Sequence, residues 1–187
     1  MMRQDGVMQA HTPTDVIFIG GRSGVGKSSL AAEAHQMLAR ADVRHAVIEG
    51  DNLDQAYPEP WRAGVDLAEQ NLAAMWKNYR AAGYSRLIFT NTVSVLRVRE
   101  LAAALGTEVQ PFTVLLTATD ATAAHRLAQR EVGTALKQHI DRSNAAARKL
   151  DAAPDTVLRI TSDGRSVSDV AREVLARAGW LCLRKLA

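Results

Sequence analysis

Eight residues near the start of the chain, 21–28, are spaced for holding a polyphosphate. They read Gly-Arg-Ser-Gly-Val-Gly-Lys-Ser and complete a G-x-x-x-x-G-K-[ST] phosphate-binding loop. Its glycines allow backbone dihedrals that other residues avoid, so that successive N–H groups can point at phosphate oxygens. The Lys27 ammonium can reach the outer phosphates, and the Ser28 hydroxyl can hold Mg²⁺. The predicted nucleotide-binding residues of this segment are Gly21, Ser23, Gly24, Val25, Gly26, Lys27, Ser28 and Ser29.

The sequence on either side of the loop supports this interpretation. Residues 16–19 are a short apolar run that predicts a buried strand, and residues 29–34 predict the start of a helix. The positive end of that helix dipole would add to the field at the phosphates. An ordinary glycine turn is the alternative, and the complete match with both flanks makes it the weaker one. We therefore expect a nucleoside triphosphate, ATP, to bind here with Mg²⁺.

Apolar runs alternate with helical patterns along the rest of the chain. This alternation predicts an α/β fold with a five-stranded parallel sheet and helices on both faces. Strands are expected at about residues 15–20, 46–49, 86–90, 112–116 and 156–160. Helices are expected at about residues 27–41, 61–82, 94–105, 120–131, 134–150 and 167–178, with Asp120 as an N-cap. The 187 residues suit one domain at 14–180, between a loose N-terminal tail (1–13) and a C-terminal tail (181–187).

The overall composition excludes several classes of protein. Hydrophobic residues make up 47% of the chain and charged residues 23%, and no apolar run approaches the roughly 20 residues of a membrane span. The first six residues lack the apolar core of a secretory signal, and the single cysteine, Cys182, permits no internal disulfide. These features indicate a cytoplasmic protein. A net charge of only +3 and 5% aromatic residues disfavour a nucleic-acid partner.

Polar residues follow the predicted strands, at the edge where such sheets bind their ligands. Asp51 comes directly after the second strand. It is the candidate for a general base that orients an accepting hydroxyl, or for a carboxylate near the metal. The alternative is that Asp51 caps a helix beginning near Asn52, which is a common role for aspartate. We favour the functional role.

An acidic residue is missing where phosphate-transferring sites usually hold their metal. A hydrophobic strand next to the loop strand commonly ends in a carboxylate for Mg²⁺. Here residues 86–90 are followed by Asn91 and Thr92. Three explanations stay open: Asp51 takes the metal, Thr90 and Asn91 supply neutral ligands, or hydrolytic chemistry is weak.

Arg126 and Arg130 lie four residues apart, on one face of the helix predicted after the fourth strand. One could stack on a base while the other meets a phosphate, because a guanidinium suits both tasks. A solvated helix face is the alternative. The segment beyond contains a glycine hinge and further basic residues, namely Gly133, Lys137, His139 and Arg142. This arrangement favours a helical lid at about 133–150 that excludes water from the transfer step.

Two further segments have open roles. Tyr57, Trp61 and Arg62 could line a pocket for an acceptor, and a buried hydrophobic anchor is the alternative for Trp61. The stretch 180–185 is apolar and then basic. We expect it to pack on the domain or on a second subunit of a homodimer, with contact at a membrane surface as the weaker alternative.

With these residues in place, the chain resembles the small-molecule kinase branch of the P-loop proteins, which includes adenylate, shikimate, gluconate and adenylylsulfate kinases and chloramphenicol phosphotransferase. The resemblance is carried by the phosphate loop and by residues 119–130 and 161–166. It implies that Arg126 packs on adenine, that Arg130 approaches the phosphates, and that the backbone around Gly164 and Arg165 touches the adenine. It also implies that Asp51 activates the acceptor.

A closer likeness, over about residues 15–178, is to the bacterial tunicamycin-resistance ATP-binding proteins. Residues 57–63, 112–118 and 137–142 are similar to segments of that group and come in the same order.

These features predict an ATP-dependent P-loop kinase that moves the γ-phosphoryl group to a hydroxyl of a small molecule, either a metabolite or an antibiotic. The expected catalytic residues are Lys27, Asp51, Arg130 and Arg142. The main alternative is an ATP-binding resistance or switch protein without a phosphoryl acceptor. A GTPase is disfavoured because the chain has no Asn-Lys-x-Asp tetrad, and a kinase of nucleic acids is disfavoured by the dispersed charge.

Overall fold

The computed structural model of the chain describes residues 12–129 and 134–181. Helices and strands alternate through these residues in the order expected of an α/β fold. The elements are β1 (Thr14–Gly20), α1 (Lys27–Arg40), β2 (Ala46–Glu49), α2 (Leu67–Ala81), β3 (Arg86–Thr90), α3 (Val98–Leu105), β4 (Val109–Thr117), α4 (Asp120–Ala128), α5 (Thr134–Leu150), β5 (Leu158–Thr161) and α6 (Val167–Arg177).

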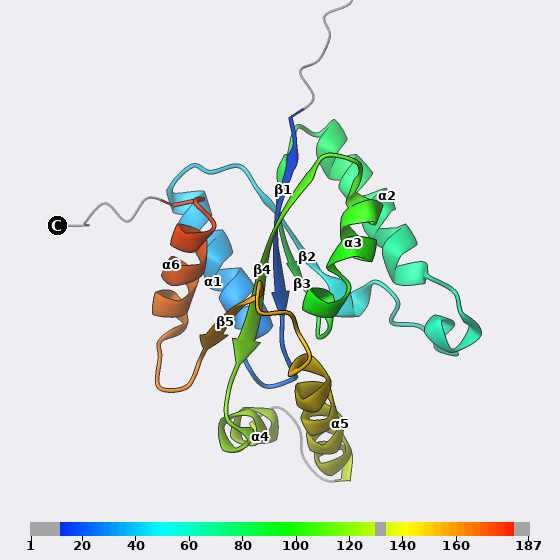
Figure 1. Cartoon of the computed structure of the whole chain (residues 1–187), viewed down its shortest axis with the longest axis vertical. Coiled ribbons are helices and arrows are strands. Elements are labelled where there is room, and N and C mark those ends of the chain that lie inside the picture. The colour runs from blue at the N-terminus through cyan, green and yellow to red at the C-terminus, as the bar shows by residue number, and fades with distance from the viewer. Residues whose placement is uncertain (1–11, 130–133, 182–187) are drawn as a thin grey trace, which may run out of the picture.

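The strands form a parallel sheet with β1 at its centre and the order β2-β3-β1-β4-β5 (Figure 1). In the register of the sheet, Ile19 of β1 lies beside Thr90 of β3, which in turn lies beside Glu49 of β2. The carboxyl ends of these three strands therefore meet at one edge, directly where the phosphate loop leaves β1. The predicted five-stranded parallel sheet is confirmed.

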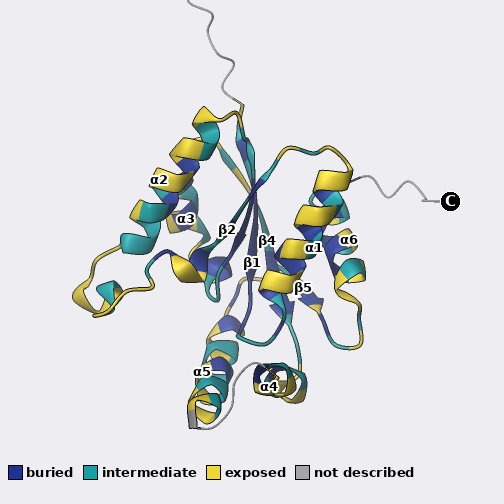
Figure 2. Ribbon diagram, turned by 180° about the vertical axis from the view of Figure 1, so that it is seen from behind, coloured by how far each residue is buried: buried dark blue, intermediate teal, exposed yellow. Residues whose placement is uncertain are grey.

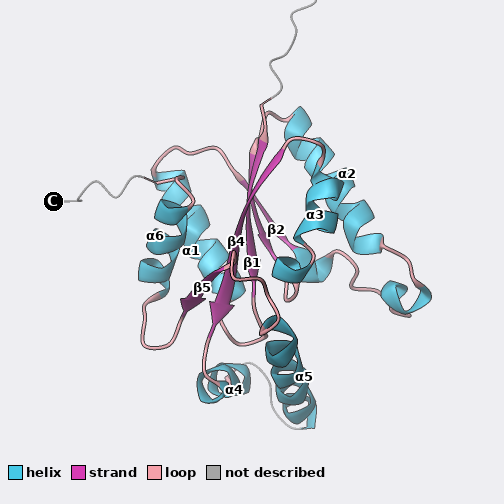
Figure 3. Cartoon of the chain, viewed as in Figure 1, coloured by secondary structure: helices cyan, strands magenta, loops and turns pink. Residues whose placement is uncertain are grey.

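Alternating side chains of β1 enter two separate cores, one on each face of the sheet. Ile17 and Ile19 pack with α1 and α6, whereas Val16 and Phe18 pack with α2 and α3. Figure 2 shows these helix pairs on opposite sides of the buried strands. Burial of each such side chain contributes about 1.5–3 kcal/mol, so both faces hold β1 and its loop firmly in place. Helices α4 and α5 lie beyond the carboxyl end of the sheet (Figure 3).

Several predicted boundaries were wrong. Helix α2 begins at Leu67 rather than at residue 61, because residues 60–63 form a separate 3₁₀ turn that ends at Gly64, with φ of 71°. Thr119, and not Asp120, caps α4, since its side-chain oxygen accepts from the Thr122 backbone N–H. Strand β5 begins two residues later than expected, and β4 begins three residues earlier.

Some expectations concern residues outside the described part of the chain. These are most of the N-terminal tail (residues 1–11), the lid residues Arg130 and Gly133, and the end of the chain from Cys182. The helical part of the expected lid is present as α5. None of the helices in the described ranges combines the length and the apolar character that a bilayer crossing requires.

Candidate functional site

The phosphate loop has the backbone geometry that its glycines were expected to provide. Gly21, Gly24 and Gly26 have φ angles of 149°, 87° and 100°, in the left-handed region that L side chains rarely adopt. A Cβ atom at Gly24 would lie 2.5 Å from the Ala123 carbonyl oxygen. Glycine is therefore required at this position both by the dihedral angle and by the approach of α4.

Lys27, the first residue of α1, places its ammonium at the loop. Its Nζ donates to the Gly21 carbonyl oxygen at 2.9 Å and lies 3.9 Å from Asp51 Oδ2. The side chain is 8% exposed. Burial lowers the pKa of Lys27, and the negative charges of Asp51 and Glu49 oppose that shift. The loop thus carries a buried cation whose charge is supported by two nearby carboxylates.

Asp51 is held by the segment that follows β3. Its Oδ1 accepts from Asn91 Nδ2 at 2.9 Å and from the Thr92 backbone N–H at 3.2 Å, while Oδ2 faces the Lys27 ammonium. The short 3₁₀ turn at Gly50–Asn52 has no side-chain cap. Capping, the alternative role for Asp51, is therefore wrong. The carboxylate is held between the segment after β3 and the Lys27 ammonium, and it remains half exposed.

Glu49 supplies a carboxylate that sequence reasoning missed. Its Oε2 accepts from Thr90 Oγ1 at 2.6 Å and from Ser28 Oγ at 3.2 Å. The acid absent from the end of β3 is thus provided by β2, one strand further from the loop. A signal for it was available in the sequence, since Glu49 is the last residue of the predicted second strand, but its relevance depends on the strand order.

The oxygen atoms near Ser28 suit a hard divalent cation. A hydroxyl and a carboxylate are ligands of the kind that Mg²⁺ prefers, together with phosphate oxygens and water. In the described ranges no three acidic, histidine or cysteine side chains converge on one point. Ser28 and Glu49 therefore fit a magnesium ion that is held largely by a nucleotide, either directly or through water.

A cavity of about 330 Å³ adjoins the loop on the side of α4 and α6. Arg126 lines it, and its Nη1 donates to the Val25 carbonyl oxygen at 3.0 Å and to Ser162 Oγ at 2.9 Å. Arg165 also lines the cavity and pairs with Glu173 at 2.8 Å. The structure thus brings Arg126 and Arg165 to the same cavity as the loop. The described residues that line it are Gly24, Val25, Gly26, Ser29, Leu30, Leu116, Arg126, Gln129, Ser162, Arg165, Val167 and Val170, so Gly164 is not among them.

The basic residues expected on the lid, Lys137 and Arg142, are exposed on α5. Their neighbour Ser143 is only 2% exposed and faces the phosphate loop. The structure therefore does not place the Arg142 side chain at the phosphate loop. Its predicted partner, Arg130, lies outside the described residues.

The segment before α2 is exposed. Tyr57 is 94% exposed and Trp61 is 60% exposed, so the alternative that Trp61 is a buried hydrophobic anchor is wrong. The Arg62 guanidinium lies over the Trp61 ring, 5.1 Å from its centroid. Figure 1 shows this segment reaching away from the sheet before α2 begins.

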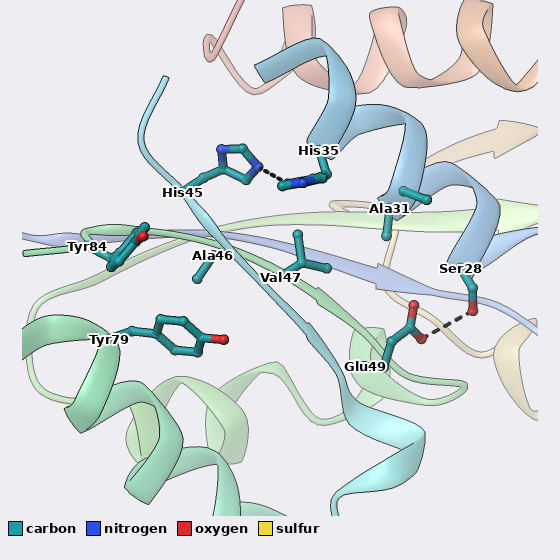
Figure 4. Close-up of a pocket in the computed structure, with 10 residues that line it drawn as sticks. Ser28, Ala31, His35, His45, Ala46, Val47, Glu49, Tyr79 and Tyr84 are labelled. Carbon is teal, nitrogen blue, oxygen red and sulfur yellow. Dashed lines mark hydrogen bonds between the residues drawn. The ribbon is translucent and has the colours of Figure 1, made fainter. Parts of the chain in front are cut away.

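A groove of about 380 Å³ runs beside β2 from the Ser28–Glu49 pair (Figure 4). At its other end, His35 Nδ1 and His45 Nε2 are 2.9 Å apart. Tyr79 of α2 and Tyr84, in the connection before β3, form the opposite wall. The groove thus leads from the residues that suit the metal to an end lined by aromatic side chains.

Comparison with known families shows which family the chain belongs to. Residues 16–157 match the family AAA_33, described as an AAA domain. The chain belongs to this family. The match includes the phosphate loop, Glu49, Asp51 and Arg126, whereas Ser162 and Arg165 lie beyond its end. No curated protein matches the chain in sequence.

Solved structures show the same fold at low sequence identity. The tunicamycin resistance protein of Deinococcus radiodurans has a TM-score of 0.60 and 21% identity, over 90% of this chain and 97% of that one. A gluconokinase from Sinorhizobium meliloti 1021 has a TM-score of 0.57 and 18% identity, over 90% and 93%. The shikimate kinase of Acinetobacter baumannii, in complex with shikimate, has a TM-score of 0.55 and 13% identity, over 89% and 93%. This AAA_33 chain therefore has the nucleotide-binding fold of the P-loop small-molecule kinases.

Proposed function

We propose that this protein is an ATP-dependent phosphotransferase that moves the γ-phosphoryl group to a hydroxyl of a small molecule, a metabolite or an antibiotic. The observation that carries the proposal is the placement of Asp51. Its carboxylate is oriented by Asn91 and Thr92 and lies 3.9 Å from the Lys27 ammonium. A fixed carboxylate beside the Lys27 ammonium is suited to accepting the proton of a hydroxyl that attacks the γ-phosphate.

Each residue has a defined task in this reaction. The loop amides and Lys27 bind the β- and γ-phosphates and offset their charge. Asp51 takes the proton as the acceptor O–H bond breaks; the new P–O bond forms and ADP leaves with the bridging oxygen. Arg126 and Arg165, with the backbone at Gly164, would contact the adenine side of ATP. Arg130 and Arg142 would close over the phosphates once the lid moves.

Ser28 and Glu49 would hold Mg²⁺, which when bound neutralises charge on the phosphate oxygens. The absence of an acid after β3 had favoured an ATP-binding resistance or switch protein without an acceptor. Glu49 removes that argument, because its carboxylate reaches the Ser28 hydroxyl. We therefore prefer the phosphotransferase, acting in the cytoplasm on a small molecule. A homodimer remains a proposal that the measured mass in solution would test.

Two steps test this function. Thermal unfolding is first followed with ATP, GTP and Mg²⁺, and binding should raise the midpoint by mass action. A panel of hydroxyl-bearing metabolites and antibiotics is then added with the magnesium complex of AMPPNP, including aromatic compounds because Tyr79 and Tyr84 line the adjacent groove. Compounds that stabilise the complex are assayed for transfer of labelled phosphate from ATP. Tight ATP binding with no transfer to any of them would favour the protein without an acceptor.

A further inference from the structure

Arg22, the second residue of the phosphate loop, extends its side chain to α4 and α5. It is 4% exposed, and its guanidinium binds two helices that lie beyond the sheet. Its Nε donates to Ser143 Oγ of α5 at 2.9 Å, Nη2 donates to Asn144 Oδ1 of α5, and Nη1 pairs with Asp120 at the start of α4. One buried side chain therefore ties the loop to both helices.

Ser143 completes the connection in the opposite direction. Its hydroxyl accepts from Arg22 and donates to the Ser23 carbonyl oxygen at 2.8 Å. The loop backbone at Ser23 and the loop side chain at Arg22 are thus bonded to the same atom of α5. Hydrogen bonds in such a buried ring strengthen one another, and loss of one member leaves the others unsatisfied.

We propose that Arg22 and Ser143 form a clasp that positions α5 on the phosphate loop, so that nucleotide affinity depends on a contact between the loop and α5. The proposal rests on the proposed function only in that the loop binds ATP. Leu150, at the end of α5, is buried in a core cluster with Leu115. The helix is therefore fixed at its middle and at its end, and closure of the lid would involve residues 134–142. Arg142 precedes Ser143, so the clasp also sets the position of its backbone.

The geometry explains why this position carries arginine. A planar guanidinium offers several donors in one fork, and here the fork reaches a carboxylate, an amide and a hydroxyl. A lysine could pair with Asp120 but could not reach α5 through two further bonds. Asp120 is 80% exposed, so its ion pair alone adds little. The bonds to Ser143 and Asn144 are therefore the part of the network that nucleotide binding should depend on.

A double-mutant cycle on the full chain tests the clasp, with the magnesium complex of AMPPNP as probe and calorimetry as the measurement. Arg22→Ala and Ser143→Ala should each weaken binding about tenfold, which corresponds to about 1.4 kcal/mol. The loss in the double variant should be smaller than the sum of the two single losses, because both changes remove the bond between Arg22 and Ser143. Arg22→Lys should not restore affinity. Lys149→Ala, an exposed change on the same helix, should bind like the parent.

Hydrogen exchange of α5 gives a second readout. In Ser143→Ala, which removes one hydroxyl and should fold, amides of residues 134–142 should exchange faster while those of α1 stay protected. Binding of both single variants within about twofold of the parent, or additive losses in the double variant, would overturn the clasp. Either of these outcomes is compatible with the proposed function if the parent binds AMPPNP and Lys27→Ala does not. A parent that binds no nucleotide would refute both.

Discussion

Replacement of Glu49 by glutamine should raise the Mg²⁺ concentration that nucleotide binding requires. Nucleotide binding without metal should stay almost unchanged. Glutamine has the shape of glutamate but no charge. The change therefore removes the anion beside Ser28, where we place Mg²⁺, and preserves the packing at the end of β2. Lys27, which would bind the phosphates directly, stays in place.

The expected size of the effect follows from the contacts of Glu49. Its Oε2 receives bonds of 2.6 Å from Thr90 and 3.2 Å from Ser28. Such bonds contribute about 1.5–3 kcal/mol with a charged acceptor and about 0.5–1.5 kcal/mol with a neutral one, so one weakened bond corresponds to about tenfold. Mutation of a carboxylate that orients a metal ligand typically lowers metal affinity by about 10–100-fold. We expect the Mg²⁺ concentration at half saturation to rise within that range.

The assay is a titration of Mg²⁺ into the protein with a fluorescent ADP analogue, repeated with EDTA for metal-free binding. Glu33→Gln is the matched control, because Glu33 lies on α1 and pairs with Arg40 at 3.9 Å, away from the site. Its magnesium dependence should equal that of the parent. The reasoning about the metal is refuted if Glu49→Gln shows the parent's magnesium dependence, or if it loses metal-free binding to the same extent as metal-dependent binding.

Three further predictions concern Asp51, Lys27 and His45. Asp51→Ala should lower phosphate transfer to the acceptor about 100-fold or more while nucleotide affinity changes little, which turnover and calorimetry would separate; unchanged turnover would rule out a general base. Because burial lowers the pKa of Lys27 from the ordinary 10.5, nucleotide affinity should fall with rising pH before 10.5 is reached, as the ammonium is lost; affinity that holds up to that pH would contradict the assignment. Burial likewise lowers the pKa of His45 in the folded protein. As the pH drops below 6.5, His45 is therefore protonated more readily in the unfolded chain than in the folded one, and the stability of the fold should fall. Thermal midpoints at several pH values should show this decline in the parent and less of it in His45→Gln, and equal slopes would exclude His45 as the cause.

Local sequence patterns were sufficient for the parts of the molecule that depend on neighbouring residues. The phosphate loop, β2 and β3 were placed correctly, because turn glycines and short apolar runs leave a clear local signal. The start of α2 was wrong because Gly64 interrupts a segment whose composition is otherwise compatible with a helix. Propensity alone does not show which of several plausible starts the tertiary structure selects.

The missed site residues depend on contacts between distant segments. Glu49 reaches Ser28 only because β3 lies between β2 and β1, a strand order that no local pattern specifies. Arg22 occupies a variable position of the loop motif, and its partners on α4 and α5 are 98 to 122 residues away in the sequence. Trp61 was open to two interpretations, and its exposure follows from the path of the segment before α2.

We expect the loop at residues 21–28 to bind the phosphates of ATP, with Lys27 as the cation that contacts them. Calorimetric titration of MgATP into the parent and into Lys27→Ala tests it most directly. We expect saturable binding to the parent and a loss of affinity of about 100-fold or more in the variant, since a desolvated charge contact of this kind is worth several kcal/mol. Equal affinity of the two proteins for MgATP would contradict it.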